Sequence, residues 1–408
     1  MVVRVDVEAD AVPPRRLTFA AWGGVGVGWS CVGVGSHGAT VTAPRTRTAA
    51  HGRAVRHPAR VRSLSPVTQQ NSTTDPSATD PTIDVIAIGN SLVDVISQET
   101  DAFVEGLGVP KGSMQLIDEA RALELYDAMG ATIEISGGSA ANTVVGVASF
   151  GGSAQYLGKV RDDQLGGVFA HDIRATGVRY EVPLAADGPA TGCCLVLVTP
   201  DAQRTMNTFL GASANFGPAD LDADAIASAG VLYLEGYLFD PPAAQEAFRA
   251  AASIAHGAGR TVALTLSDSF CVDRHRAAFA ELVEHHVDLL FANEDEILAL
   301  YEVDDFDVAV ERVRASGTLA ALTRSEAGSV VVTPDEVVAV PAHPVAEVLD
   351  TTGAGDLYAA GFLYGHSRGL DVATCARLGS LAASEVISHI GARPEHSLAE
   401  LAAPLLNS

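Results

Sequence analysis

The second half of the chain alternates short apolar runs with longer segments in which apolar residues recur every three or four positions. The apolar runs read VLYLEG (231–236), TVALTLS (261–267) and VDLLFAN (287–293), and the segments between them have a helical period. Strands that are apolar along their whole length are typical of a parallel sheet covered on both faces. The pattern predicts an α/β fold with a central, mainly parallel sheet flanked by helices on both faces. Helices are expected over 241–259, 274–286, 294–302 and 307–316.

A second group of β-type runs lies in the first half of the chain. VRYEVPLA (178–185), TGCCLVLVT (191–199) and RTMNTFLG (204–211) follow one another with turns between them, and residues 111–116 also alternate in character. Three such strands between two α/β regions predict a small inserted β-sheet. A small sheet beside an α/β core is a natural lid, and its segments are expected near 95–118 and 178–212.

Residues 1–82 differ from the rest of the chain, with nine arginines, no lysine and both tryptophans. Residues 33–38 match G-x-G-x-x-G, but Pro44 follows where a helix should begin, so we expect no dinucleotide site there. Arg15-Arg16 faintly resembles an export signal, although glycines break the apolar stretch behind it. We leave this segment out of the predicted fold, either as a disordered extension or as a start assigned too far upstream.

The chemistry is concentrated in VLDTTGAGDLYAAGFLYG (348–365). A glycine-rich turn that opens a helix leaves backbone N–H groups without partners, and Gly353, Ala354 and Gly355 can donate theirs to an anion. Asp356 falls in the first turn of the helix, where a carboxylate can accept the proton of an attacking hydroxyl. The alternative is an ordinary acidic residue that complements the helix dipole. The stretch favours phosphoryl transfer.

Net charge and cysteine usage restrict the partners. The chain has 50 acidic and 26 basic residues, a net charge of −24, which argues against a nucleic-acid or anionic-membrane partner. Because a protein this acidic repels ATP at long range, a nucleotide site would need local cations and Mg²⁺. No apolar run reaches the length of a membrane span. The five cysteines lack any framework spacing, which indicates reduced thiols and a cytoplasmic protein.

Polar residues follow the strand predicted at 83–89, and such positions bind ligands in α/β sheets. Asn90 and Asp94 together suit neighbouring hydroxyls of a sugar, whereas an Asx turn or a helix cap is the alternative. Asn293 and Thr323 end two other predicted strands. We therefore expect these residues to meet at one rim of the sheet, together with the turn at 353–356.

Two distant motifs resemble a known family. DTTGAGD (350–356) and GGSAANTVVGVASFGG (137–152) resemble the two signatures of the PfkB-type, ribokinase-like carbohydrate kinases. The resemblance runs from about Ile83 to the C-terminus and implies a ribokinase-like kinase domain over 83–408. Within the family the chain is most similar to adenosine kinases. Residues 90–94 are similar to their ribose-binding motif, and LTLSDSF (264–270) resembles their purine-stacking segment.

The resemblance implies that ATP gives its γ-phosphate to a primary hydroxyl, the 5′-hydroxyl if the acceptor is adenosine, which would give AMP for purine salvage. Asp356 would be the base, the turn of Gly353, Ala354 and Gly355 the anion hole, and Arg204 would approach the γ-phosphate from the lid. The acceptor would be bound by Asn90, Leu92, Asp94, Gly137, Gly138, Asn142 and Phe270, with Leu92 and Phe270 on either side of the base.

The same resemblance implies a nucleotide site at Asn293, Glu296, Thr323 and Gly328. Asn293 and Glu296 would hold Mg²⁺ through water, because Mg²⁺ loses its water ligands reluctantly. Asp350 and Thr352 fit a monovalent cation such as K⁺.

Three other functions remain open from the sequence. One is a PfkB-type kinase for another nucleoside or for a sugar such as ribose or fructose. Another is a nucleoside-binding sensor without turnover, and a third, disfavoured one is a dehydrogenase. The expected partners are ATP and a small nucleoside or sugar, and the chain could be a monomer or a homodimer.

Overall fold

The computed structural model of this chain describes residues 81–201 and 203–407. The predictions for residues 33–38, for Arg15-Arg16 and for Cys31 lie outside the described residues, as does nearly all of the segment expected to be an extension.

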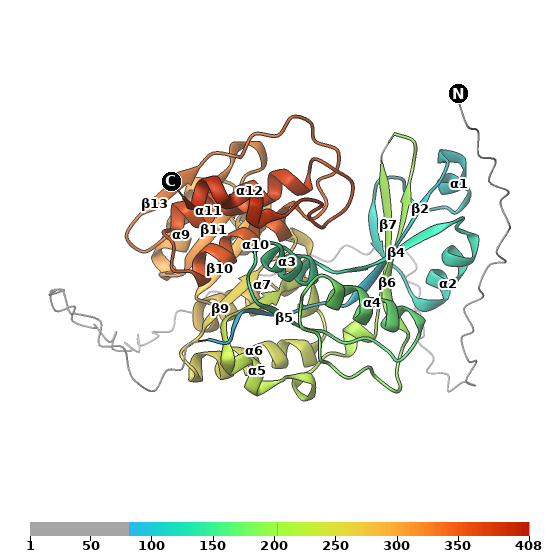
Figure 1. The fold of residues 1–408 in the computed structure, drawn as a ribbon, viewed down its shortest axis with the longest axis horizontal. Helices are drawn as coiled ribbons and strands as arrows, with labels where there is room; N and C mark the ends of the chain where they lie inside the picture. The colour runs from blue at the N-terminus through green and yellow to red at the C-terminus, as the bar shows by residue number, and fades with distance from the viewer. Residues whose placement is uncertain (1–80, 202, 408) are drawn as a thin grey trace, which may run out of the picture. The chain divides into compact units, whose positions relative to one another are not determined.

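An eight-stranded sheet, here called the main sheet, has the strand order β13-β12-β11-β10-β9-β8-β1-β5 (Figure 1). The six strands from β11 to β5 are parallel, whereas β12 and β13 are antiparallel at one edge. This confirms the predicted α/β fold with a mainly parallel sheet. The strands are β1 (Ile83–Ile88), β5 (Ala154–Leu157), β8 (Ala229–Glu235), β9 (Thr261–Thr265), β10 (Leu289–Asn293), β11 (Leu319–Thr323), β12 (Ser329–Val332) and β13 (Val337–Val340).

Helices cover both faces of the main sheet because successive side chains of a strand point to opposite faces. In β1, Val85 and Ala87 belong to one hydrophobic core, and Ile86 and Ile88 to the other. The first core contains α3 (Ser139–Ser149), α10 (Ala354–Ser367), α11 (Val372–Val386) and α12 (Leu398–Leu406). The second contains α5 (Ala223–Ser228), α6 (Pro242–Gly257), α7 (Ser269–His286), α8 (Glu294–Tyr301) and α9 (Phe306–Ser316).

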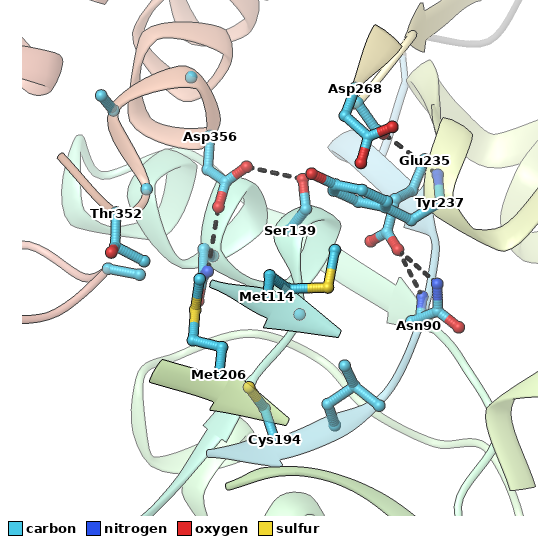
Figure 2. A pocket seen from close by; sticks show the side chains of 18 of the residues that line it. Asn90, Met114, Ser139, Cys194, Met206, Glu235, Tyr237, Asp268, Thr352 and Asp356 are labelled. Atoms are coloured by element: carbon cyan, nitrogen blue, oxygen red, sulfur yellow. Dashed lines mark hydrogen bonds between the residues drawn. The ribbon is translucent and has the colours of Figure 1, made fainter. Parts of the chain in front are cut away.

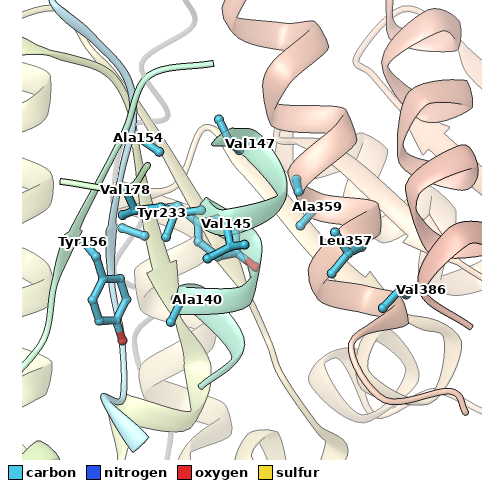
Figure 3. Packing of buried hydrophobic residues seen from close by; sticks show 14 of the residues in the cluster. Ala140, Val145, Val147, Ala154, Tyr156, Val178, Tyr233, Leu357, Ala359 and Val386 are labelled. Carbon is cyan, nitrogen blue, oxygen red and sulfur yellow. The ribbon is translucent and has the colours of Figure 1, made fainter. Parts of the chain in front are cut away.

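Helices α3 and α10 pack closely against each other, as Figure 3 shows. A Cβ atom at Gly146 of α3 would lie 2.6 Å from Cβ of Ala360 and 2.7 Å from Cδ1 of Leu357, both on α10. Only glycine fits there without a shift of the neighbouring helix. The close contact brings the N-terminal turns of the two helices, which carry the family signatures, to the same place.

A five-stranded sheet, here called the second sheet, has the order β3-β7-β6-β2-β4 (Figure 1). Helices α2 (Glu119–Ala128) and α4 (Gln164–Ala175) pack against its strands, and α1 (Asp101–Gly106) follows β2. Alternation again separates the faces, because Val93 and Val95 of β2 are buried in the core. The strands are β2 (Leu92–Gln98), β3 (Met114–Leu116), β4 (Thr132–Gly137), β6 (Thr191–Val198) and β7 (Arg204–Gly211).

The membership of the second sheet differs from the prediction. Residues 178–185 were expected to form a strand of it, and this was wrong. They make only isolated bridges, from Arg179 to Gln155 of β5 and from Ala185 to Arg161, which lies beyond the end of β5. Pro183 lacks the N–H group that a regular ladder would need. The second sheet also contains β2, whose residues 95–98 fall in the lid segment expected near 95–118, and β4, over which no strand was predicted.

Helix α7 begins at Ser269 rather than at 274, because the side chain of Asp268 caps it by accepting from the N–H of Cys271, and non-helical dihedral angles at His275 kink it. Across residues 81–201 and 203–407, no helix combines the length and the apolar character that a membrane crossing requires. The cysteines of the described residues, Cys193, Cys194, Cys271 and Cys375, are buried free thiols.

Candidate active site

A cleft of about 1100 Å³ lies between the second sheet and the carboxyl ends of the parallel strands of the main sheet. Most of the predicted site residues line it: Asn90, Leu92, Asp94, Gly138, Asn142, Arg204, Phe270, Asn293, Glu296, Thr323, Thr352, Gly353, Ala354, Gly355 and Asp356. Gly137, Gly328 and Asp350 are not among the lining residues. The rim expected from the strand ends is therefore present in the structure.

Asp356 lies in the first turn of α10, and both of its carboxylate oxygens accept hydrogen bonds from α3 (Figure 2). The Ser139 hydroxyl donates to Oδ1 at 2.6 Å, and Nδ2 of Asn142 donates to Oδ2 at 3.0 Å. Burial raises the pKa of Asp356, while these two donors oppose the rise. The two bonds fix the carboxylate in the cleft, and the remaining lone pairs can accept a proton.

The turn before Asp356 is shaped by Gly353, which has a φ of 80° and would bring a Cβ atom within 2.8 Å of Ala392. The N–H of Ala354 donates to the carbonyl of Thr351 at 3.2 Å, so it is already engaged. The N–H of Gly355 lies in the first helical turn, where no intrahelical acceptor exists. Together with the N–H of Gly353, it leaves the turn suited to an anion.

Arg204, at the start of β7, bridges the second sheet to this turn. Its guanidinium lies 2.7 Å from Oδ2 of Asp350 and donates to the Thr352 hydroxyl at 3.0 Å. The Asp350 carboxylate also accepts from the N–H and hydroxyl of Thr352 and from the N–H of Gly391. Arg204 thus already supplies positive charge beside Asp350. A monovalent cation at Asp350 and Thr352 stays a prediction.

Asp94 of β2 is placed against a glycine of the neighbouring strand. A Cβ atom at Gly137 would lie 2.5 Å from Oδ2 of Asp94, so glycine makes room for this carboxylate. The pKa of Asp94 is raised to about 6, mainly by burial. The positive charges of Arg393 and Arg204 oppose this rise, and the negative charge of Asp356 adds to it. Asp94 therefore lies near Asp356, the carboxylate that we expect to act as the general base.

Asn142 contacts a residue that the sequence analysis did not identify. Nε of Arg393 donates to Oδ1 of Asn142 at 3.3 Å, and its NH1 pairs with Asp172 at 3.0 Å. A guanidinium can only donate hydrogen bonds. Arg393 therefore holds the carbonyl end of the Asn142 amide, which turns the NH₂ end toward Asp356.

Glu235, at the end of β8, is a second residue that the sequence analysis missed. Its Oε1 accepts from the backbone N–H and from Nδ2 of Asn90, at 3.1 and 2.8 Å (Figure 2). Its Oε2 accepts from the N–H of Ala140 at 2.7 Å. Burial raises the pKa of Glu235 to about 7, although these three bonds favour the charged form.

Asn293 and Glu296 form a capping box at the start of α8. Nδ2 of Asn293 donates to the Glu296 carboxylate at 2.6 Å, and the N–H of Glu296 donates to Oδ1 of Asn293 at 2.8 Å. Burial raises the pKa of Glu296 to about 7. The pair has a structural role that the motif alone does not reveal, and both residues line the cleft.

The second sheet gives the cleft an apolar wall. Alternate residues of its strands line the cleft: Leu92, Ile96, Met114, Leu116, Ile135, Val196, Met206 and Leu210. Phe270, at the start of α7, also lines the cleft and is 73% exposed. An exposed aromatic ring at the mouth of an apolar cleft is available for stacking on a ligand.

Gly328 does not line the cleft, and its part in a nucleotide site stays a prediction. It lies between β11 and β12 with a φ of 88°, and a Cβ atom there would come within 2.2 Å of the carbonyl of Val340. Three residues of the site were not predicted from the sequence: Ser139, Glu235 and Arg393. Ser139 lies within the 137–152 motif and could have been found there, whereas the other two stand outside the motifs.

Comparison with known proteins identifies the family of this chain. The profile described as pfkB family carbohydrate kinase matches residues 115–398. The chain belongs to the PfkB family. An adenosine kinase from Sinorhizobium meliloti shares 52% identity over 79% of this chain and 99% of its own, with a TM-score of 0.74. A probable sugar kinase from Rhizobium etli shares 49% identity over 80% of this chain and 99% of its own, with a TM-score of 0.75.

A third relative is more distant. The 5-dehydro-2-deoxygluconokinase of Shouchella clausii is 26% identical over 337 residues, covering 78% of this chain and 94% of its own. As a PfkB-family enzyme, the chain is a phosphotransferase that uses an alcohol group as acceptor, and its acceptor is a sugar or a nucleoside.

Proposed function

We propose that this PfkB-family enzyme transfers the γ-phosphoryl group of ATP to the 5′-hydroxyl of adenosine and so forms AMP. The observation that supports this best is the wall of apolar side chains on the second sheet, together with the exposed ring of Phe270, which lines the same cleft. A free sugar offers little apolar surface to such a wall, whereas a purine can stack on an aromatic side chain, which contributes about 1–3 kcal/mol per base. The relative from Sinorhizobium meliloti, titled an adenosine kinase, supports the same acceptor.

The charges around the acceptor site support a neutral substrate. Arg204 is paired with Asp350 and Arg393 with Asp172, at 2.7 and 3.0 Å. An acceptor with a carboxylate, such as a gluconate, would meet Asp94 and Asp356, and among the described residues it would have to compete with Asp350 and Asp172 for Arg204 and Arg393. A nucleoside or a neutral sugar meets hydrogen-bonding groups instead.

Asp356 would accept the proton of the attacking hydroxyl as its oxygen bonds to the γ-phosphorus and the bond to the β-phosphate oxygen breaks. General-base catalysis of this kind contributes roughly 10²–10⁴ in rate. The N–H groups of Gly353 and Gly355 would stabilise the charge on the transferred group. Arg204 would approach the γ-phosphate from β7, and it would have to loosen its pairing with Asp350 to do so.

Thr323 would line the nucleotide, and Asn293 and Glu296 would hold Mg²⁺ through its water ligands. The donor set fits, since Mg²⁺ prefers oxygen ligands and keeps several waters. When bound, Mg²⁺ would neutralise charge on the phosphates. The pKa of Glu296, which burial raises to about 7, leaves its carboxylate largely ionised only above neutral pH.

The test is an assay of the purified protein with ATP and Mg²⁺ against adenosine, guanosine, inosine, ribose and fructose, with chromatographic identification of the product. We expect 5′-AMP from adenosine as the main product. Faster phosphorylation of ribose or fructose would instead favour the second candidate, a sugar kinase, which the relative from Rhizobium etli supports.

A further inference from the structure

The carboxylate of Asp350, just ahead of the glycine-rich turn, is bonded by four donors of the protein itself. Its Oδ1 accepts from the N–H of Thr352 at 3.0 Å and from the Thr352 hydroxyl at 2.7 Å. Its Oδ2 accepts from the N–H of Gly391 at 2.9 Å and lies 2.7 Å from NH1 of Arg204. The two oxygens of a carboxylate offer about four lone pairs, so these donors use the full capacity of Asp350.

Arg204 supplies the positive charge at this carboxylate. The side chains of Arg204 and Asp350 are 12% and 7% exposed, so the ion pair is largely withdrawn from water. NH1 of Arg204 also donates to the Thr352 hydroxyl at 3.0 Å, so the guanidinium contacts both residues at which we predicted a monovalent cation. A K⁺ ion would need the same oxygens and would be repelled by the like charge of the guanidinium. Asp350 and Thr352 therefore do not fit the ion that the family resemblance implied.

The ion pair joins segments that lie far apart in the sequence. Arg204 begins β7 of the second sheet, whereas Asp350 leads into the turn before α10, and Gly391 lies in the C-terminal loop. Both contacts of Arg204 are made by NH1. The other NH₂ group of the guanidinium can therefore turn toward a γ-phosphate while the charge stays beside Asp350. The positive charge that balances Asp350 is thus carried by the second sheet.

We propose that Arg204 takes the place of the monovalent cation: its guanidinium neutralises Asp350, and phosphoryl transfer by this enzyme needs no K⁺. Arginine suits this position because its guanidinium is always charged and is less strongly hydrated than an ammonium group. The inference concerns the cation and not the acceptor, so it goes beyond the proposed function and holds for a nucleoside or a sugar. Arg204 is then a positioning residue for the turn as well as a group that approaches the γ-phosphate.

Two measurements on the intact wild-type protein test the inference. The first compares kcat and KM for ATP with Mg²⁺ in KCl and in tetramethylammonium chloride of equal ionic strength. We expect each constant to agree within about twofold between the salts, because only general screening acts in both. The second is thermal unfolding of the ligand-free protein in the same two salts, where we expect equal Tm. A rise in kcat or Tm that is specific to K⁺ would overturn the inference, and the unfolding measurement decides it even if no acceptor is turned over.

Arg204→Met removes the charge and keeps an unbranched apolar side chain. Asp350 then becomes a buried carboxylate without a countercharge, so Tm in tetramethylammonium chloride should fall. K⁺ can now bind beside Asp350, and KCl should restore part of the lost Tm, because an ion that binds only the folded state stabilises it. A Tm equal to that of the wild type, or a loss that KCl does not restore, would limit Arg204 to a packing role and overturn the inference.

Further variants separate the charge from other effects of the substitution. In Arg204→Met combined with Asp350→Asn, no charge is left for K⁺ to balance, so the response to KCl should disappear. A response that persists would place the K⁺ ion elsewhere and contradict the inference. Arg204→Lys keeps the charge and should not respond to K⁺. If Arg204→Met does not fold, Arg204→Lys and the wild type decide the inference, because a response of either would overturn it.

Arg249→Met is the matched control for the loss of an arginine from an ion pair. Arg249 lies 2.9 Å from Glu281, and the two side chains are 35% and 39% exposed, so solvent screens their charges. This variant should keep wild-type kinetics and the same Tm in both salts. A response of Arg249→Met to K⁺ equal to that of Arg204→Met would show that the effect is not specific to Asp350, and would contradict the inference.

Discussion

The two walls of the cleft carry different kinds of side chain. The rim of the main sheet, with the first turns of α3 and α10, presents carboxylates and amides that hydrogen-bond to one another, such as Asp356 with Asn142. The second sheet presents alternate apolar residues, and Met114 and Leu116 are 47% and 55% exposed. The rim holds Asp356 and the turn before it, whereas the second sheet offers a mainly apolar surface for the acceptor and contributes Asp94 and Arg204 as its charged residues. Substitutions of Asp356 and of the apolar residues should therefore affect rate and specificity separately.

The largest effect is expected for Asp356→Asn on the rim. The amide keeps the size of the side chain but cannot accept the proton, so kcat should fall by roughly 10²–10⁴. The fold should be retained, because burial already raises the pKa of this carboxylate and its removal relieves a desolvated charge. Steady-state kinetics and thermal unfolding measure the two effects, and near wild-type turnover would refute a role as base.

Phe270→Ala, at the start of α7, should change specificity. Loss of stacking should raise KM for adenosine by roughly 5- to 150-fold, which corresponds to about 1–3 kcal/mol. Its kcat/KM for ribose should not change. Met114→Ala on the second sheet is the companion variant. An equal loss of kcat/KM with adenosine and with ribose would show that these residues do not select for the base.

Arg393→Met should lower kcat on the order of tenfold, because the Asn142 amide loses the donor that orients it toward Asp356. Asp172→Asn is its matched control: it removes the ion pair of Arg393 and leaves the bond to Asn142 in place. We expect a smaller loss in the control, and equal losses in both variants would assign the effect to the ion pair.

The smallest effect concerns pH. Burial raises the pKa of Glu296 to about 7, so as the pH falls through 7 its carboxylate is protonated and its hold on the waters of Mg²⁺ weakens. KM for ATP with Mg²⁺ should rise severalfold from pH 8 to pH 6, and Glu296→Gln should flatten this dependence. Because the folded pKa lies above the unfolded value, the stability that Glu296 contributes is present below about pH 4.5 and is lost as the pH rises through 7.

The contrast between the walls also explains what the sequence could predict. The motifs at 137–142 and 350–356 are local, because each packs several functional groups into one turn, and they were found. The parallel strands were found because they are apolar throughout. Strand β2 was not predicted because Asn90 and Asp94 were interpreted as ligand-binding residues. The buried Val93 and Val95 nevertheless alternate with Leu92 and Asp94, as in a strand.

The contacts of Glu235 and Arg393 could not be predicted because their partners lie far away in sequence. Glu235 bonds to Asn90 across 145 positions, and Arg393 bonds to Asn142 across 251. A glutamate at the end of a strand and an arginine in a loop carry no local signal of such partners. Their roles appear only once the fold has brought α3, β8 and the C-terminal loop together.

The most direct test of the central claim is the ratio of kcat/KM for adenosine to kcat/KM for ribose, measured on the wild-type protein with saturating ATP and Mg²⁺. If the apolar wall and Phe270 bind a purine, the ratio should be at least roughly tenfold in favour of adenosine, as stacking of one base implies. A ratio of one or less would contradict a nucleoside acceptor and leave a PfkB-family sugar kinase.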